Sequence, residues 1–216
     1  MRISLPLLVA AGLALAGCSF ESADEAARVS LYERLGTRER LAIADPSFVG
    51  VAAYDRAGRP LPCVQPTVRG GDTVLRASTD GLLVVEDVRV DLSDITIEPG
   101  VVLPDEPLVL TDVKLRLGTQ MAIEPQWAPD GRSARGVGRV DILMDWALLD
   151  DDGDHLPLAT QRIRGAELEV RAELADDGTV RADLTSAVDG TIWDFAAVEL
   201  TDFAMDVRAA SQPVVD

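Results

Sequence analysis

The stretch AELEVRAELADDGTVRADL, which spans residues 166–184, decides the fold class of this chain. Apolar residues occupy every second position on both sides of the pair Asp177-Gly178. A strand places such residues on one face, whereas a helix distributes them around its axis. Asp and Gly tolerate the backbone angles of tight hairpins. The stretch therefore predicts two antiparallel strands with one apolar face and one solvated face.

The same alternation recurs along most of the chain, and further Asp-Gly pairs separate the alternating runs. These pairs begin at Asp80, Asp130, Asp152 and Asp189, and no Pro-rich or Ser-rich linker divides the region. We therefore expect a single all-β domain over residues 46–216, an antiparallel meander that forms either a sandwich or a curved sheet. Alternation assigns residues to faces but does not order the strands, so both architectures remain open.

Three of the alternating runs resemble one another: residues 85–92, 110–117 and 200–207. In each run the alternation of apolar and polar residues shifts by one position. The shift falls at Glu86-Asp87 in the first run and at a Thr-Asp pair in the other two. A β-bulge has this effect, because it inserts one residue into a strand, bends it and resets its apolar face. The runs therefore suggest bent strands around an apolar concave side. The alternative is that hydrophobic alternation alone makes them look repetitive.

The beginning of the chain has the pattern of an export signal. Its apolar run, residues 3–16, is too short to span a membrane, which takes roughly 20 apolar residues, but it suits the core of a signal peptide. The run leads into the tetrapeptide LAGC, which ends at Cys18 and resembles the lipobox of bacterial lipoproteins. The resemblance covers residues 1–18. It implies transfer of diacylglycerol to the Cys18 sulfur, cleavage before Cys18 and loss of residues 1–17 as the signal peptide.

A lipid on Cys18 would tie the protein to a membrane of the bacterial envelope. Two or more acyl chains anchor a protein stably, whereas a single chain holds it only marginally. Ser19 stands where the inner-membrane retention signal of such lipoproteins usually has Asp, so we expect the outer membrane. The alternative is an ordinary secretory signal followed by a chance cysteine.

Residues 18–45 are expected to form the anchored tether and a short helix. Ser22 and Glu25 make a capping-box pattern, and apolar residues then recur at helical spacing as far as residue 35. If Cys18 is lipidated, Cys63 has no partner within the chain, so no disulfide framework is possible. Cys63 is then either a small buried apolar residue or a reactive thiol.

The charge of the chain restricts its partners. With 37 acidic and 20 basic residues the formal net charge is -17 at pH 7. A field of this sign opposes nucleic acid and anionic lipid head groups. We therefore expect no nucleic-acid partner, and contact with a membrane only through the lipid anchor.

Few residues suggest chemistry. The single histidine, His155, excludes metal sites that need two histidines, and no nucleophile-elbow or phosphate-binding motif occurs. The best candidate for a cation is the series Asp150, Asp152 and Asp154, whose alternating spacing resembles that of calcium loops. An EF-hand is rejected, because His155 and Gln161 occupy positions that require Gly and Glu. The alternative is a solvated acidic hairpin turn.

Three functions remain open. The first is a non-catalytic scaffold that meets another envelope protein through an acidic rim or free sheet edges. The second is a carrier or binding module for a lipid or another apolar ligand. The third is a carboxylate-dependent hydrolase, although no catalytic pair of carboxylates can be selected among so many. We expect binding rather than catalysis. An empty apolar cavity would favour the second function, and a cleft with two facing carboxylates would favour the third.

Overall fold

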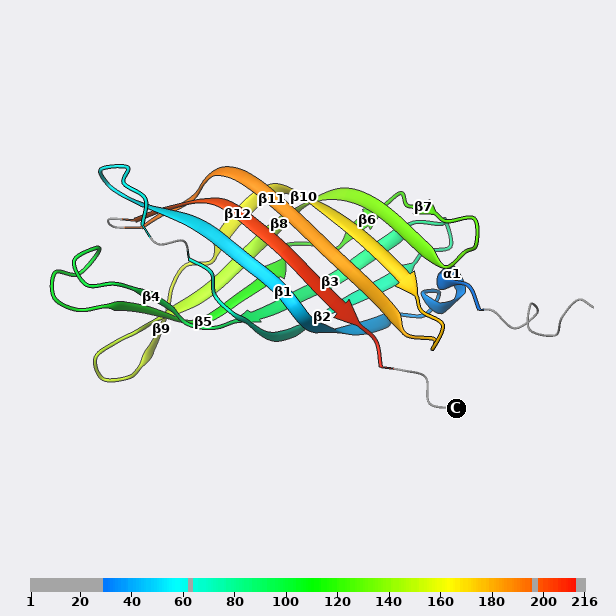
Figure 1. Cartoon of the computed structure of the whole chain (residues 1–216), viewed down its shortest axis with the longest axis horizontal. Helices are drawn as coiled ribbons and strands as arrows, with labels where there is room; N and C mark the ends of the chain where they lie inside the picture. Colours follow the sequence, from blue (N-terminus) through cyan, green and yellow to red (C-terminus); the bar gives the residue numbers. More distant parts are fainter. Residues whose placement is uncertain (1–28, 62–63, 196–197, 213–216) are drawn as a thin grey trace, which may run out of the picture.

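The computed structural model describes residues 29–61, 64–195 and 198–212, and within them the protein is almost entirely β-sheet (Figure 1). One short helix, α1 (Leu31–Arg34), precedes a sheet of 12 strands. The strands are β1 (Glu39–Asp55), β2 (Val68–Ala77), β3 (Leu83–Leu92), β4 (Ile95–Ile97), β5 (Leu108–Leu117), β6 (Met121–Ile123), β7 (Gln126–Trp127), β8 (Ser133–Leu149), β9 (His155–Pro157), β10 (Gln161–Leu174), β11 (Val180–Phe195) and β12 (Val198–Ala210).

Eight of these strands close into an antiparallel barrel in the order β5-β3-β2-β1-β12-β11-β10-β8, with β5 paired to β8. The expected all-β antiparallel meander is confirmed, but the expected sandwich or open curved sheet is wrong. The last strand returns to the first: β12 pairs with β1 from Ala42↔Ala210 to Asp55↔Val198. Closure gives each wall strand a partner on both sides for at least part of its length. Closure depends on how far the whole sheet curls, and the local alternation of residues does not encode this.

The bulges suggested by the three similar runs are present. The β2–β3 register shifts opposite Glu86, and the β5–β8 register shifts between Thr111 and Lys114. The β1–β12 register shifts between Thr201 and Ala204. Asp112 and Asp202 adopt nearly the same left-handed backbone, with φ of 52° and 51°. The slip in apolar parity thus marks places where a strand bends, and bends of this kind help a sheet to close.

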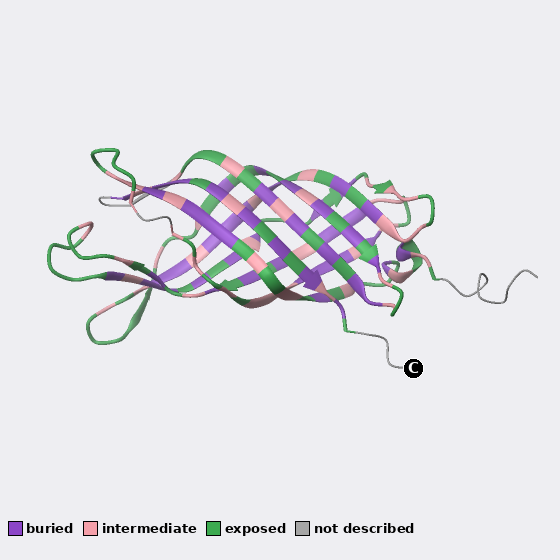
Figure 2. Ribbon diagram, in the orientation of Figure 1, coloured by how far each residue is buried: buried purple, intermediate pink, exposed green. Residues whose placement is uncertain are grey.

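The barrel is apolar inside and charged outside. Leu168, Val170 and Leu184 are fully buried, whereas Glu167 and Arg171 on the same strands are exposed. Figure 2 shows this alternation of buried and exposed residues along the wall strands. The apolar residues of these strands therefore face the interior of the barrel, and the charged residues face outward. Among the described residues, no helix has the length and apolar character needed to cross a bilayer.

Helix α1 covers one end of the barrel, which we call the α1 end. Ser30 caps the helix and Glu33 completes a capping box, while Leu31 and Leu35 are fully buried in the core cluster. The amide N of Ala77 donates to the carbonyl O of Leu35 at 2.7 Å, which ties this segment to β2. The first described residues and the C-terminal end of β12 both lie at this end of the barrel (Figure 1).

The expected helix over residues 22–35 is barely present, because the structure forms only the turn at Leu31–Arg34. Ser22 and Glu25 lie outside the described residues. Ser30 and Glu33 have the same capping spacing, and they are the pair that caps a helix in this structure. Strand β1 also begins earlier than expected, at Glu39, so the barrel includes part of the region assigned to the tether.

Candidate functional site: an apolar pocket at the open end

The end of the barrel opposite α1, which we call the open end, is bordered by loops rather than by a helix (Figure 1). Strands β1 and β2 pair only from Glu39↔Leu75 to Ala42↔Asp72, so toward the open end β1 has no β2 partner. The loop between these strands follows β1 instead. Val51 and Val64 exchange backbone hydrogen bonds of 3.0 and 3.1 Å, and the amide N of Leu61 donates to the carbonyl O of Ala53.

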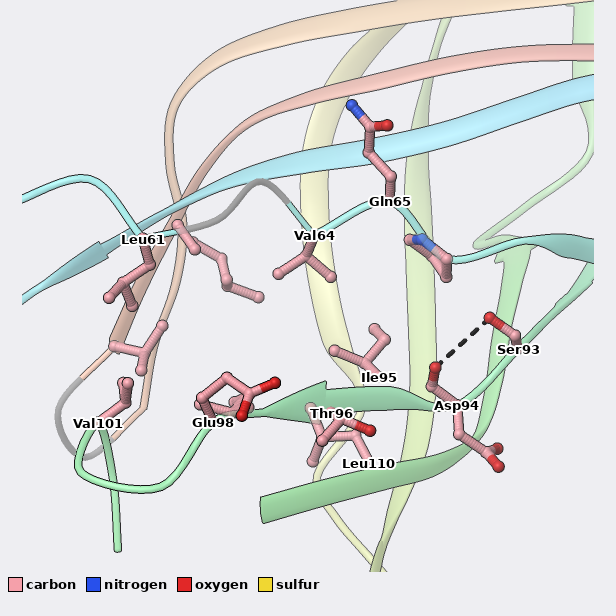
Figure 3. A pocket seen from close by; sticks show the side chains of 15 residues that line it. Leu61, Val64, Gln65, Ser93, Asp94, Ile95, Thr96, Glu98, Val101 and Leu110 are labelled. Carbon is pink, nitrogen blue, oxygen red and sulfur yellow. Dashed lines mark hydrogen bonds between the residues drawn. The ribbon is translucent and has the colours of Figure 1, made fainter. Parts of the chain in front are cut away.

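A pocket of about 270 Å³ lies at this end, enclosed by that loop, β4 and the ends of the wall strands (Figure 3). Its floor is buried and apolar, formed by Ala53, Ile95, Leu110, Val198 and Leu200. Its sides are half-buried, formed by Leu61, Val64, Ile97 and Val101. The space is slightly below the usual range for drug-sized ligands, so it suits a small apolar molecule or one end of a longer one.

Polar groups stand at the rim of the pocket. Asp94 precedes β4 and Glu98 follows it, so two carboxylates flank a strand whose isoleucines line the cavity. Thr111 Oγ1 donates to Asp94 Oδ1 at 3.0 Å, and Arg69 Nη2 lies 3.9 Å from Asp94 Oδ2. The exposed side chain of Glu98 has no hydrogen bond or ion pair within the described part of the chain.

The polar side chains that line the pocket, within the described residues, are either uncharged or acidic. Among the described residues that line the pocket there is no Lys, Arg or His. The hydroxyl of Ser93 accepts from the amide N of Thr67 at 3.0 Å, which holds the end of the 56–67 loop against the start of β4. The arrangement is therefore a mostly apolar cavity with a few polar groups at its mouth, which is the usual composition of a small-molecule binding site.

The predicted cation residues form the turn between β8 and β9. Asp150 Oδ1 accepts from the amide N of Asp152 at 3.0 Å and from that of Asp154 at 2.8 Å. This carboxylate oxygen therefore satisfies backbone donors of a hairpin turn. Within the described residues, no group of three or more His, Cys, Asp or Glu side chains is placed to hold a metal ion. Calcium binding there stays an untested prediction.

His155 lies beside a bulge rather than within the acidic turn. Its Nδ1 is 2.6 Å from Oδ2 of Asp112, the residue with the left-handed backbone on β5. The hydrogen bond from His155 lowers the pKa of Asp112, and both side chains are about half exposed. Cys18 and Cys63, the lipidation candidate and the expected free thiol, lie outside the described residues.

Carboxyl groups with clearly shifted pKa values all shift the same way in the described part of the chain. The main cause in each is a hydrogen bond from a backbone amide or from an Arg or His side chain. These groups, each with a lowered pKa, are Glu33, Asp55, Glu86, Asp112, Asp145, Glu169, Asp177 and Asp202. A general acid needs a raised carboxyl pKa. None of these groups is prepared for that role.

The pocket was not predicted as a site, because its lining comes from segments far apart in the sequence. Alternation correctly placed Leu110 and Leu200 on apolar faces of strands, but it did not show that both meet Val64 and Ile95 at one mouth. The only local signal was Ile95-Thr96-Ile97, a short alternating run between two acidic residues. Such a run has the same pattern in any strand of the sheet.

Comparison with known proteins gives no match: no family model fits the chain, and neither a curated protein nor a solved structure is significantly similar to it. The fold and the pocket together define the class as a closed antiparallel barrel of eight strands with an apolar pocket at its open end. Function must be argued from that geometry.

Proposed function

We propose that this protein is a lipid-anchored binding protein of the bacterial envelope that holds a small apolar ligand in the pocket at its open end. The observation that carries the proposal is the apolar cavity of about 270 Å³, with its buried aliphatic floor and its polar rim. Closed barrels of eight strands are either filled by side chains or hold one small ligand. Here a large apolar cluster occupies the interior, and the cavity lies at the open end of the barrel.

Two features make the scaffold function less favourable than the sequence suggested. A scaffold was expected to use free sheet edges, but barrel closure through β1–β12 and β5–β8 pairs the wall strands with each other. A scaffold of this kind also needs no accessible apolar face, whereas Val64, Ile97 and Val101 remain half-buried around the pocket. An acidic surface that meets another envelope protein remains the alternative function.

The hydrolase function has weaker support still. The carboxyl groups of the described residues that shift clearly have lowered pKa values, as in structural ion pairs and turns. Glycosidase chemistry would require a pair of carboxyl groups about 5–10 Å apart across a cleft, one of them with a raised pKa. We therefore base the proposal on binding.

The anchor and the pocket would stand at opposite ends of the molecule. The described chain starts at Val29, beside α1 (Figure 1), and Cys18 precedes Val29 in the sequence. A lipid on Cys18 would hold the α1 end toward the membrane and direct the pocket away from it. The ligand would then be exchanged with the aqueous side of the envelope rather than with the anchoring leaflet.

Retained ligand is tested by native mass spectrometry. A chain that begins at Ser19 keeps every residue of the core cluster, so it can be studied in water without lipid or detergent. We expect a discrete extra mass that organic solvent removes. A bare polypeptide would show that no ligand survives purification, and binding would then be decided with an added probe.

The probe is the neutral fluorophore N-phenyl-1-naphthylamine, added to the same chain. We expect saturable one-to-one binding that V101T preserves and V101W weakens by at least about tenfold, because the indole would occupy the cavity. V137W is the matched control, since Val137 is 49% exposed on the outer wall. If V101W and V137W bind the probe equally well, the pocket is not the binding site and the proposal fails.

A further inference from the structure

We infer that the ligand of the pocket is an amphipathic cation, with an apolar body and an ammonium, amine or guanidinium group that meets the carboxylate of Glu98. The inference rests on the proposed function and narrows the class of ligand. It runs against the expectation of a fatty acid or phospholipid, which a lipid-anchored barrel with an aliphatic pocket would first suggest.

Within the described lining, no cationic side chain is present to pair with an anionic head group. Carboxylates and phosphates are held by Arg, Lys or clusters of backbone N–H groups. The described residues that line the pocket include no basic side chain, and the nearby guanidinium of Arg69 already faces Asp94 at 3.9 Å. A fatty acid placed with its chain on the floor would bring its carboxylate beside Glu98. Two like charges at that separation repel each other.

Glu98 is the group that a positive charge would meet. It follows β4, whose Ile95 and Ile97 line the cavity, and Glu98 lines the same cavity (Figure 3). The carboxylate of Asp94 points away from them and already accepts a hydrogen bond from Thr111. Because Glu98 is exposed and without a described partner, it can pair with a ligand cation without losing an existing bond.

The loops around the mouth add a field of the same sign. The loop after β4 carries the exposed Asp105 and Glu106, and the turn between β8 and β9 carries Asp151, Asp152 and Asp154. The neighbouring loop carries two arginines: Arg59 is paired with Asp55 at 2.6 Å, and Arg56 is not without a partner either. In a chain of net charge -17, this concentration of carboxylates raises the local concentration of cations at the mouth. The apolar floor of the pocket therefore favours the apolar body of such a ligand, and the acidic rim favours its positive charge.

The test uses three probes with the same decyl chain: decyltrimethylammonium, decanol and decanoate, each kept below its micelle concentration. Each probe displaces N-phenyl-1-naphthylamine from the chain that begins at Ser19. We expect decyltrimethylammonium to bind about tenfold more tightly than decanoate and more tightly than decanol. Added salt should weaken only the binding of the cation, because an exposed pair is screened.

Two matched variants distinguish the effect of the Glu98 charge on cation binding from the effect of the net charge of the chain. E98Q and D80N each remove one negative charge, but Glu98 borders the pocket while Asp80 lies in the turn at the α1 end. We expect E98Q to weaken binding of the cation by up to about fivefold, the upper value for an exposed ion pair, and to leave binding of decanol unchanged. D80N should change neither probe.

The outcomes distinguish the two proposals. If V101W abolishes binding of every probe but the cation has no advantage, the pocket binds apolar ligands and this inference alone is overturned. Equal weakening of the cation by E98Q and D80N would also overturn it, since attraction would then come from net charge alone. If no probe binds in a way that V101W affects, the proposed function itself fails.

Discussion

Single glycines show how closely the strands approach each other. Gly71 on β2 has φ of 129°, and a Cβ atom built there would lie 2.0 Å from the carbonyl O of Arg89 on β3. No side chain fits that space, because the obstacle is backbone. Its neighbour Gly70 has φ of 152° but no atom within 4 Å of such a Cβ. Both residues have positive φ, but a Cβ atom would clash only at Gly71. Comparing substitutions at the two positions therefore separates the energetic cost of the clash from the cost of the backbone conformation.

We predict that G71A destabilises the barrel by about 2–4 kcal/mol, because β2 must move away from β3 or adopt a strained conformation. G70A should cost only about 1 kcal/mol, for the unfavourable φ alone. Chemical denaturation of both variants and the wild type measures the difference in free energy of unfolding. If both variants lost the same free energy of unfolding, the close approach of Gly71 to Arg89 would not contribute to the destabilisation.

At the bulges, the residue type follows from the backbone. Asp112 and Asp202 adopt positive φ, which Asp tolerates better than apolar residues do. Asp202 Oδ1 also accepts from the amide N of Gly190 at 3.0 Å, so its side chain satisfies a backbone donor of the facing strand at the irregularity. These two Asp residues were assigned to bulges from sequence, and the structure explains why each is Asp.

At the scale of elements, an ion pair spans the seam where β5 meets β8. Arg116 Nε lies 2.6 Å from Asp145 Oδ2, and Thr160 Oγ1 donates to Asp145 Oδ1 at 2.6 Å. The hydrogen bond from Arg116 is the main cause of the lowered pKa of Asp145, and the same bond raises the pKa of Arg116. The pair thus joins the strands whose pairing closes the wall.

We predict that D145N lowers the free energy of unfolding at pH 7 by about 0.5–1 kcal/mol, the value of a partly exposed pair. A folded pKa below the unfolded value near 3.9 means that the stabilisation is complete above that value and is lost as pH falls through the folded pKa. The difference between wild type and D145N should therefore shrink below about pH 4. D151N, on the exposed turn after β8, is the control. A difference that stayed constant down to pH 2 would contradict this account.

At the scale of the whole molecule, the proposed anchor can be tested independently of the pocket. Full-length wild type, C18S and C63S are expressed in a Gram-negative bacterium supplied with labelled palmitate. We expect label on wild type and on C63S but none on C18S, because the thioether lipid would form on Cys18 and acylation of the new amino terminus would depend on it. Label on C18S, or none on wild type, would show that the lipobox resemblance does not reflect lipidation.

Much of the local structure could be predicted from sequence. The alternation around residues 166–184 predicted a hairpin, and β10 and β11 pair from Leu168↔Ser186 to Leu174↔Val180. The slip at Thr111-Asp112 predicted a bulge where the register shifts. The pocket could not be predicted, since Leu110 and Val198 become neighbours of one cavity only after the barrel has closed.

The sequence by itself determined the all-β class, the antiparallel pairing, the inward and outward faces and the bulges, because each depends on residues close together in the chain. Only the tertiary structure decided that the meander closes, that α1 covers one end and that an apolar pocket with a carboxylate rim opens at the other. Closure depends on the summed twist, bend and stagger of eight strands, and a property summed over the whole sheet has no local pattern.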